Sequence, residues 1–498
     1  MLAQSLQSTF CRSFFKPSPE FCPMSNNEEE YRISAEPVKS FFVSMLTRDI
    51  SLEDAILDLL DNCVDGILRS VSSKVIDTEK PYEGYEAKIE FSKNSFTICD
   101  NCGGIPWSLS KYAFQMGRPS DRPSDPNDKR MVGVYGIGMK RAIFKMGMDC
   151  TITTKHENDA YSVRFSPEWI RDENDWHIQA EHASLKNAGT TIHVCELHAD
   201  AMTRFSESAE GFPGELYDKI VGQYAIIIDK GFAISVNGKT VIPRPIKLTF
   251  AKKDVPSAVR PYIFMSRVDD VDVFLTVGFT RRIPSEGTVL EEQEDKKFSS
   301  QNAGWTIVCN DRVVLYCDRS ELTGWGEAGV PRYHTQFIAV AGILEFSSND
   351  ASKLPTTTTK RGIDASSTLY LQVKNRMREG MKLFTDYTNK WKGDTARSRT
   401  HFDEKNTELL PLTKLKKEAE RLSMTKTRGT ALVGEYYKPN LPMPQDKTRD
   451  SSSRIAFTVE KDKIEPVRKH LGMDQGSDAS SVGKACFNEV YEEARSCR

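Results

Sequence analysis

The chain has 498 residues, 39% of them hydrophobic and 28% charged, with a formal net charge of −2. This length fits about three domains. The near-neutral charge excludes a global attraction to nucleic acid, so any such attraction must be local. We find no apolar run approaching the roughly 20 residues that a membrane helix needs, and therefore expect no membrane partner. The 11 scattered cysteines favour reduced thiols and a cytoplasmic protein, or a nuclear one in a eukaryote.

The N-terminal residues 1–34 are predicted to be a disordered tail. Arg12 and Lys16 are the only basic residues before Met24. That is few for an organellar targeting segment, so we favour an unstructured tail or a start at Met24. Residues 36–48 carry apolar side chains at helical spacing and predict a short helix.

Residues 51–70 predict an amphipathic helix that begins at the capping residue Ser51. Asp58, Asn62 and Asp65 lie four and then three residues apart, so they share one stripe of this helix. A carboxylate can take a proton from water, and an amide oxygen can ligate a hard cation. The stripe therefore suits a site for a magnesium-bound nucleotide, although a solvated acidic face is the alternative.

Residues 87–91 and 95–99 alternate in polarity and predict a hairpin of two strands. The second strand runs into Asp100-Asn101-Cys102-Gly103-Gly104-Ile105. A buried aspartate here can accept a hydrogen bond from an exocyclic amine such as that of adenine, and the glycines allow close approach of the backbone. An ordinary tight turn would show the same pattern. Cys99 and Cys102 have the spacing of a zinc pair, but we find no second pair at such spacing.

A glycine-rich segment, Gly133-Val134-Tyr135-Gly136-Ile137-Gly138-Met139-Lys140, leads into a predicted helix at 141–146. It follows a predicted helix at 107–116 and a polar run at 118–130 that we expect to be a mobile loop. Backbone N–H groups and the helix dipole would favour phosphate at such a place, whereas a glycine turn packed on a sheet is the alternative. Further strands are predicted at 150–154, 161–165 and 189–194, where Thr190 can offer a hydroxyl group to a base or to water.

Taken in order, these segments resemble the motifs of the GHKL ATPase superfamily: gyrase B subunits, ninety-kilodalton heat-shock chaperones, MutL proteins and histidine kinases. The resemblance implies a Bergerat-type α/β sandwich over residues 35–205, ATP and Mg²⁺ as ligands, and a lid at residues 118–131. It also implies nucleotide contacts from Asn62, Asp65, Asp100, Gly104, Ile105, Gly133, Tyr135, Gly136, Ile137, Gly138, Met139, Lys140 and Thr190, with Asn62 as the metal ligand.

Asp58 stands where related ATPases carry the glutamate that activates water. Aspartate is shorter by one methylene, about 1.5 Å, so the resemblance implies slow hydrolysis or an ATP sensor that barely hydrolyses. Cys102 also departs from the pattern, because it replaces a glycine. A sensor-kinase function is disfavoured, since the first histidine of the chain is His156, after the second glycine segment.

The following region predicts a helix at about 213–225, a hairpin over 224–237 with its turn at 229–231, and a second hairpin through Asn237-Gly238. Strands are predicted at 271–279, 305–309, 312–316 and 337–346, and a helix at 369–391. This block, 206–391, resembles the transducer domain (ribosomal S5 domain 2-like, α/β) of gyrase B, MutL and microrchidia (MORC) proteins, and is closest to the MORC arrangement. Lys360 then matches the lysine that reaches the γ-phosphate. A solvated lysine in a polar loop is the alternative.

The C-terminal part is predicted to be a helical linker at 392–450, with a helix at 412–422, and a small β-α-α unit at 451–498. This unit has a strand at 455–459 and helices at 461–471 and 482–494. It suits a DNA-reading dimer or, more plainly, a docking unit. The resemblance implies an ATP-driven clamp that forms a homodimer and acts on DNA or with a DNA-processing protein. A chaperone-like or regulatory ATPase acting on protein clients is the alternative.

Overall fold

The computed structural model describes residues 38–71, 75, 78–117, 131–132, 136–252, 259–284, 302–357, 360–392, 394–427, 432–444, 458–474 and 478–496. The chain divides into two compact units, Met1–Pro442 and Met443–Arg498. Among the described residues, no helix is long and apolar enough to cross a membrane.

The first sheet of the larger unit has eight strands in the order β5-β4-β3-β6-β2-β1-β7-β8. It is mixed, because β1 and β7 run parallel and the other neighbours run antiparallel. The strands are β1 Glu86–Phe91, β2 Phe96–Asp100, β3 Gly147–His156, β4 Asp159–Phe165, β5 Ala180–His182, β6 Gly189–Leu197, β7 Ala233–Val236 and β8 Lys239–Thr240. The predicted hairpin of β1 and β2 and the turn at Asn237-Gly238 are confirmed.

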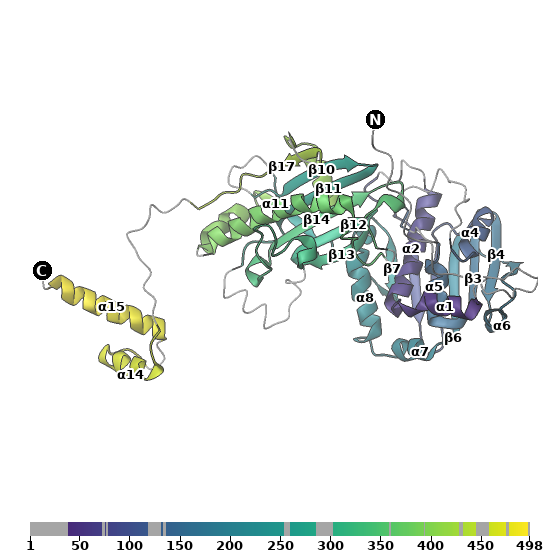
Figure 1. The fold of residues 1–498 in the computed structure, drawn as a ribbon, viewed down its shortest axis with the longest axis horizontal. Helices are drawn as coiled ribbons and strands as arrows, with labels where there is room; N and C mark the ends of the chain where they lie inside the picture. Colours follow the sequence, from purple (N-terminus) through teal and green to yellow (C-terminus); the bar gives the residue numbers. More distant parts are fainter. Residues whose placement is uncertain are drawn as a thin grey trace, which may run out of the picture. The chain divides into compact units, whose positions relative to one another are not determined.

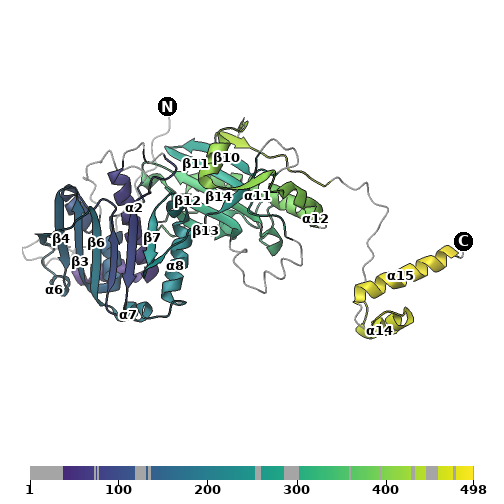
Figure 2. The ribbon, with the colours of Figure 1, turned by 180° about the vertical axis from the view of Figure 1, so that it is seen from behind.

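Helices cover one face of this sheet, with α1 Lys39–Arg48, α2 Leu52–Ser70 and α5 Gly138–Met146 lying in front of the strands (Figure 1). The view from behind shows β3, β4 and β6 without helices over them (Figure 2). The described helices of this part also include η2 Trp107–Leu109, α4 Ser110–Phe114, α6 Pro167–Arg171, α7 Ala199–Phe205, α8 Phe212–Gln223 and α9 Ala225–Asp229. The expected α/β sandwich is therefore present, with its described helices α1, α2 and α5 on one face of the sheet.

Helix α2 forms where the sequence predicts it. The Ser51 side chain accepts a hydrogen bond from the Asp54 N–H at 3.2 Å, which caps the first turn. Its apolar residues join a core with those of α5 and the inner face of the sheet, including Ile89 and Ile98. Burial of this face fixes the position of the helix on the sheet. It thereby also fixes the side chains that α2 turns toward the pocket described below.

The predicted hairpin over residues 224–237 is wrong in its first half, because residues 225–229 form helix α9. Only residues 233–236 form a strand, β7. The segment Ala-Ile-Ile-Ile-Asp is a short apolar run, which periodicity alone cannot assign to a strand or a helix. Tyr224, which directly precedes this helix, is buried, and its hydroxyl oxygen lies 2.8 Å from the Leu57 carbonyl oxygen of α2. The sheet thus continues to β8, past residue 205, where we expect the first domain to end.

The second sheet has seven strands in the order β13-β12-β14-β11-β10-β17-β16, and only β12 and β14 run parallel among its pairs in the described residues. The strands are β10 Tyr262–Val268, β11 Val271–Phe279, β12 Gly304–Cys309, β13 Arg312–Asp318, β14 Val340–Ser347, β16 Thr425–Lys426 and β17 Gly434–Tyr437. A separate pair joins β9 Lys247–Ala251 to β15 Thr407–Pro411. The strands predicted at 271–279, 305–309 and 312–316 are confirmed, and the one predicted at 337–346 begins at Val340, because residues 335–337 form a short helix.

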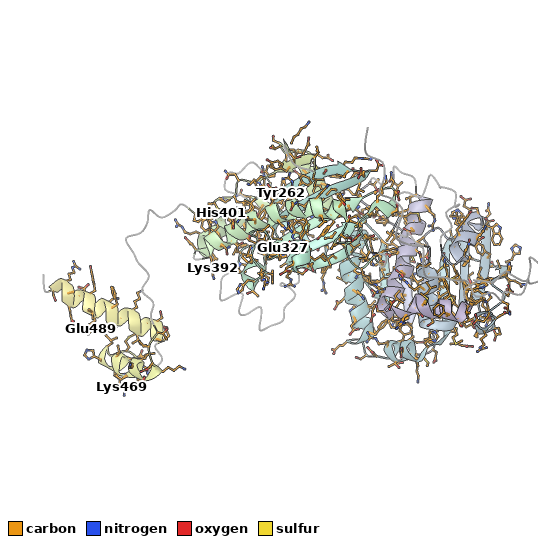
Figure 3. All side chains as sticks on the ribbon, viewed as in Figure 1. Tyr262, Glu327, Lys392, His401, Lys469 and Glu489 are labelled. Atoms are coloured by element: carbon orange, nitrogen blue, oxygen red, sulfur yellow. The ribbon has the colours of Figure 1, made fainter. Side chains whose placement is uncertain are left out.

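The long helix α11 Thr368–Trp391 packs on β10, β11 and β14, and side chains such as Tyr262 fill the layer between them (Figure 3). Shorter helices are η4 Glu321–Thr323, η5 Thr335–Phe337, η6 Ala351–Lys353, α12 Thr395–Ser398, η7 Arg399–Phe402 and α13 Leu412–Ala419. Residues 392–450 were expected to be a linker, yet β15, β16 and β17 pair with strands of this unit. These strands have two to five residues, so their sequences are too short to carry a periodic signal.

The smaller unit contains α14 Lys461–His470 and α15 Ala479–Ser496, close to the two helices expected there. Lys469 and Glu489 lie on these helices (Figure 3). The strand expected at 455–459 falls mainly on residues 455–457, which lie outside the described residues. The side chains of Phe487 and Tyr491 are each 55% exposed.

Candidate active site

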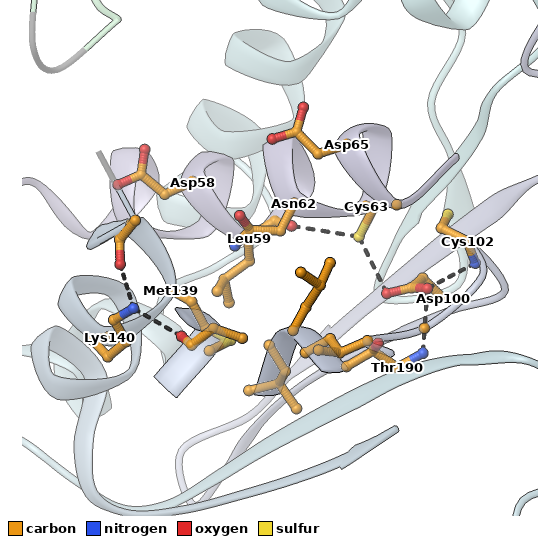
Figure 4. A pocket seen from close by; sticks show the side chains of 18 of the residues that line it. Asp58, Leu59, Asn62, Cys63, Asp65, Asp100, Cys102, Met139, Lys140 and Thr190 are labelled. Carbon is orange, nitrogen blue, oxygen red and sulfur yellow. Dashed lines mark hydrogen bonds between the residues drawn. The ribbon is translucent and has the colours of Figure 1, made fainter. Parts of the chain in front are cut away.

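A pocket lies between α2, the segment that follows β2, and the start of α5. Figure 4 shows Asp58 near Met139 and Lys140 at one end and Asp100 with Thr190 at the other. Leu59, Asn62 and Cys63 lie between them on α2. Sequence segments far apart in the chain thus meet here, and Gly104, Ile105, Gly136, Ile137, Gly138 and Lys360 also line the pocket.

Asn62 is the side chain of α2 most available to a ligand. Within the described helix it is the one residue between Asp54 and Leu68 that is not buried, and it lines the pocket. Its neighbours in sequence, Asp61 and Cys63, are only 1% and 4% exposed. Because this amide is exposed to the pocket, its oxygen is free to act as a ligand for a cation bound to a nucleotide.

Asp100 is held in place from both sides at the end of β2. Its Oδ1 accepts hydrogen bonds from the N–H groups of Cys102 at 2.8 Å and Thr190 at 3.3 Å. Its Oδ2 accepts from the Cys63 thiol at 3.4 Å. Burial raises the pKa of Asp100, and the backbone hydrogen bonds oppose this rise. The result is a fixed carboxyl group at the pocket wall that can pair with a donor such as an exocyclic amine.

Thr190 extends this hydrogen-bonded wall. Its hydroxyl lies 3.1 Å from that of Thr154, which accepts from the Ile105 N–H at 2.9 Å. Gly104 has a φ of +70°, and a Cβ there would stand 2.0 Å from the Lys155 carbonyl oxygen. Glycine is therefore required at 104 by close backbone approach to β3, which also holds Ile105 against the pocket.

The start of α5 forms the opposite end of the pocket. Gly136, Ile137, Gly138 and Met139 line it, and the helix begins at Gly138. A Cβ at Gly138 would stand 3.4 Å from the Asp58 side chain, in ordinary van der Waals contact, so the start of α5 lies close to α2 here. Free N–H groups and the positive end of the helix dipole favour an anion here. Gly133, Tyr135 and residues 118–130 of the expected lid lie outside the described residues.

Lys140 lines the pocket but uses its ammonium group within the protein. Its Nζ donates to the carbonyl oxygens of Ala113, at 2.8 Å, and of Gly136. Burial lowers the pKa of Lys140 to about 8. The lysine thus ties the end of α4 to the glycine segment before α5, which is a different use from the phosphate contact that the resemblance implies.

Asp58 forms a buried ion pair with Arg141, whose Nε lies 3.2 Å from the Asp58 Oδ2. Burial raises the pKa of Asp58, and the charges of Lys360 and Arg141 counteract this rise. A carboxylate with a raised pKa is a better proton acceptor when ionised, but here one of its oxygens is occupied by Arg141. Asp65, further along α2, accepts a hydrogen bond from the Val132 N–H at 2.6 Å. This bond ties α2 to the residue that directly precedes the glycine segment.

Asp61 joins the first sheet's helices to the second sheet. Its Oδ1 accepts from the Tyr224 hydroxyl at 2.5 Å and from Arg312 Nε at 2.8 Å, and its Oδ2 lies 3.1 Å from Lys360 Nζ. Burial would raise the pKa of Asp61, but the two cations bring it below its usual value. For Lys360, burial would lower the pKa and the carboxylates of Asp61, Asp58 and Asp65 raise it.

Two turns of the second region carry these cations to α2. The turn between β12 and β13 places Asn310, Asp311 and Arg312 in consecutive contacts with Met131, Lys230 and Asp61. The loop bearing Lys360 is closed by a bridge between Thr356 and Ile363, and Arg361 lies 2.9 Å from Asp54. Lys360 has a φ of +55°, an uncommon conformation for a side chain of this size. The loop therefore holds Lys360 in a specific position.

Sequence reasoning missed Arg141, Asp61 and Cys63. Asp61 could have been found, because a charged residue beside Leu59 and Leu60 on the apolar side of α2 needs a buried partner. Arg141 and Cys63 gave no comparable signal. Cys99 and Cys102 do not converge, since Cys99 is exposed and Cys102 is buried.

The pocket thus has a fixed carboxyl group at one end, an anion-favouring helix start at the other, and an exposed amide between them. This is the arrangement of a nucleotide-binding ATPase. Residues 50–199 match the family model of histidine kinase-, DNA gyrase B- and HSP90-like ATPases, so this region is a GHKL-like ATPase domain and implies ATP hydrolysis. A comparison with curated proteins finds no match. The matched segment ends before Lys360 and before the second sheet.

ATPases of this class bind ATP with Mg²⁺, and the residues present fit that ion. The Asn62 amide is exposed at the pocket, close to Asp58 along the helix. Asn62 would hold Mg²⁺, and the bound ion supplies neutralising charge for the phosphates. The ligand contacts of the individual residues, including that of Asn62 with Mg²⁺, stay predictions.

Proposed function

We propose that the protein is an ATP-driven switch in which Lys360 reports whether the γ-phosphate is present. One observation carries this proposal: Lys360, about 300 residues beyond α2, lines the nucleotide pocket and lies 3.1 Å from Asp61. Lys360 belongs to the region of the second sheet but enters the pocket beside α2. A ligand that binds or releases this lysine would therefore change the contact between the two regions.

Lys360 can change partners at low cost. Asp61 also binds Arg312 and Tyr224, so the departure of Lys360 leaves this buried carboxylate paired. A phosphate group at the start of α5 would offer the lysine a stronger, doubly charged acceptor. ATP would therefore draw Lys360 away from Asp61, and the loop that carries it would follow.

Hydrolysis in this scheme depends on Asp58. Its carboxylate would accept a proton from the attacking water, as the corresponding glutamate does in related ATPases. Because Arg141 occupies one Asp58 oxygen and aspartate is the shorter acid, we expect slow turnover. ATP would then persist long enough to set the state of the switch.

For the output we propose ATP-dependent homodimerisation that forms a clamp on nucleic acid, with the second region acting as a transducer. The resemblance to MutL and MORC proteins supports this proposal. DNA binding that strengthens with ATP and falls steeply with salt would support the clamp, because phosphate contacts release counterions. A protein client is the competing outcome, and it predicts no such salt dependence.

Light scattering tests the coupling between nucleotide and assembly. We expect a non-hydrolysable ATP analogue with Mg²⁺ to raise the molar mass of the wild type from monomer to dimer, and Lys360→Ala to abolish this response. Lys353→Ala is the matched control, because Lys353 pairs with the exposed Asp270 outside the pocket. A response that survives in Lys360→Ala would contradict the proposal.

A further inference from the structure

Three potential metal ligands meet at one wall of the nucleotide pocket. The sulfur atoms of Cys63 and Cys102 and a carboxylate oxygen of Asp100 lie within 4.8 Å of one another. The Cys63 sulfur is 3.4 Å from the Asp100 Oδ2 (Figure 4). All three residues line the pocket, and both cysteines are buried, at 4% and 1% exposure. The group combines one residue from α2, the last residue of β2 and one residue from the turn that follows β2.

The spacing of these atoms suits a tetrahedral zinc-type ion. With Zn–S bonds of about 2.3 Å and Zn–O bonds of about 2.0–2.2 Å, sulfur atoms on one ion stand about 3.8 Å apart and sulfur and oxygen about 3.5 Å apart. The sulfur–oxygen distance of 3.4 Å already agrees. Because the remaining separations are at most 4.8 Å, the two sulfur atoms would have to approach by about 1.0 Å at most, and the Cys102 sulfur and the Asp100 oxygen by about 1.3 Å at most.

We propose that Cys63, Cys102 and Asp100 form a binding site for a thiophilic divalent cation such as Zn²⁺, and that the bound ion excludes the nucleotide base. Binding would release the two thiol protons, and the fourth ligand position would face the pocket. The ion would engage the carboxylate that Asp100 needs for an exocyclic amine. The exclusion rests on the proposed nucleotide function, whereas the metal site itself does not.

The carboxylate favours a metal over a disulfide as the purpose of this cluster. A disulfide would need only the two sulfur atoms, brought to about 2.05 Å. The Asp100 Oδ2 lies 3.4 Å from the Cys63 sulfur and adds a hard oxygen ligand to two thiolates, a combination that zinc accepts. Cys99 has no part in the site, because it is exposed and its sulfur accepts a hydrogen bond from Thr191.

Cadmium binding tests the site without relying on activity. We would titrate the reduced full-length protein with Cd²⁺ and follow the ultraviolet absorbance of cadmium–thiolate bonds, then measure Zn²⁺ stoichiometry by equilibrium dialysis. We expect both Cys63→Ser and Cys102→Ser to lose the tightest Cd²⁺ signal and one equivalent of Zn²⁺. Cys99→Ser should retain both. Thermal unfolding of each variant, including Cys63→Ala, shows whether the protein is still folded. A folded variant that no longer binds Cd²⁺ has lost a metal ligand and not its fold.

Two results would overturn the metal site. The first is a Cd²⁺ signal that is unchanged in Cys63→Ser and Cys102→Ser. The second is a loss of the Cd²⁺ signal in Cys99→Ser as large as the loss in Cys63→Ser, which would assign the signal to thiols outside this cluster.

Competition tests the exclusion separately. We expect saturating Zn²⁺ to weaken binding of a fluorescent ATP analogue by at least about tenfold in the wild type and in Cys99→Ser, but not in Cys63→Ser. Metal binding with unchanged nucleotide affinity would overturn the exclusion. Metal binding at the cluster in a protein that binds no nucleotide would overturn the proposed function and leave the metal site standing.

Discussion

Asp61 is the carboxylate on which the contact between the two sheet regions depends. It is 1% exposed and binds Tyr224, Arg312 and Lys360. Asp61→Asn would leave two buried cations without their shared anion, which typically costs about 3–5 kcal/mol. We expect this loss in the free energy of unfolding measured with denaturant.

Asp270→Asn is the matched control for that substitution. Asp270 pairs with Lys353 at an exposed site, where solvent screens the ion pair and its contribution to stability is small. Asparagine also tolerates the positive φ of 64° found at Asp270. Equal stability losses for the two variants would show that Asp61 is not the anchor that the geometry indicates.

Asp58 should be needed for turnover and not for binding. We expect Asp58→Asn to lower the rate of ATP hydrolysis by about 10²–10⁴-fold, the usual contribution of a general base. Nucleotide affinity, measured by calorimetry, should change little. Unchanged turnover would show that Asp58 is not the base.

The acid limb of the pH–rate profile gives a second test of Asp58. Burial raises its pKa above the ordinary value of 3.8. Only the ionised carboxylate accepts a proton, so the rate should fall on acidification at a higher pH than an ordinary aspartate would give. The residual rate of Asp58→Asn should lack this limb. An identical limb in the variant would assign the titration to another group.

At the scale of elements, Lys140 links the end of α4 to the start of α5. Its pKa is about 8 in the folded protein against 10.5 ordinarily. Between these two pH values, Lys140 is protonated in the unfolded chain and largely deprotonated in the folded protein. The titration of Lys140 therefore makes the free energy of unfolding rise with pH from about 8 to 10.5. Unfolding at about pH 7.5 and about pH 9.5 should show this rise in the wild type and not in Lys140→Met. Parallel pH dependence in both proteins would contradict the burial of the charge.

The sequence predicted the elements that carry strong periodicity or turn chemistry. Helix α2 with its Ser51 cap, the β1–β2 hairpin and the Asn237-Gly238 turn are examples. Helix α9 was mistaken for a strand, because three successive isoleucines have no diagnostic period. Strands β15 and β17 were missed, because their pairing partners are distant in sequence and they are short.

The pocket residues likewise fall into those predicted from a local motif and those that depend on contacts between distant segments. Asn62, Asp100 and Thr190 were predicted from local motifs and are brought together at the pocket. Arg141 and Arg312 were not, because an ion pair between distant segments leaves no mark in either segment. Lys360 is predicted only through the resemblance to transducer domains. Its position in the pocket depends on a contact between residues far apart in the sequence, which a periodic pattern cannot predict.

At the scale of the whole molecule, nucleotide state is expected to act through the loop that bears Lys360 and the turn that bears Arg312. Both contact α2 through Asp61, and Arg361 adds a contact with Asp54 near the start of the helix. A change at one end of α2 would therefore reach the second sheet. This coupling is the central claim of the account.

Nucleotide discrimination measured by calorimetry tests that claim most directly. We would compare the affinities of ADP and a non-hydrolysable ATP analogue, each with Mg²⁺, for wild type, Lys360→Ala and Lys353→Ala. A charge-assisted contact to the γ-phosphate contributes about 1.5–3 kcal/mol, so Lys360→Ala should weaken the ATP analogue by roughly 10- to 150-fold and leave ADP almost unchanged. Lys353→Ala should match the wild type. Equal losses for both nucleotides, or no loss for either, would contradict the account.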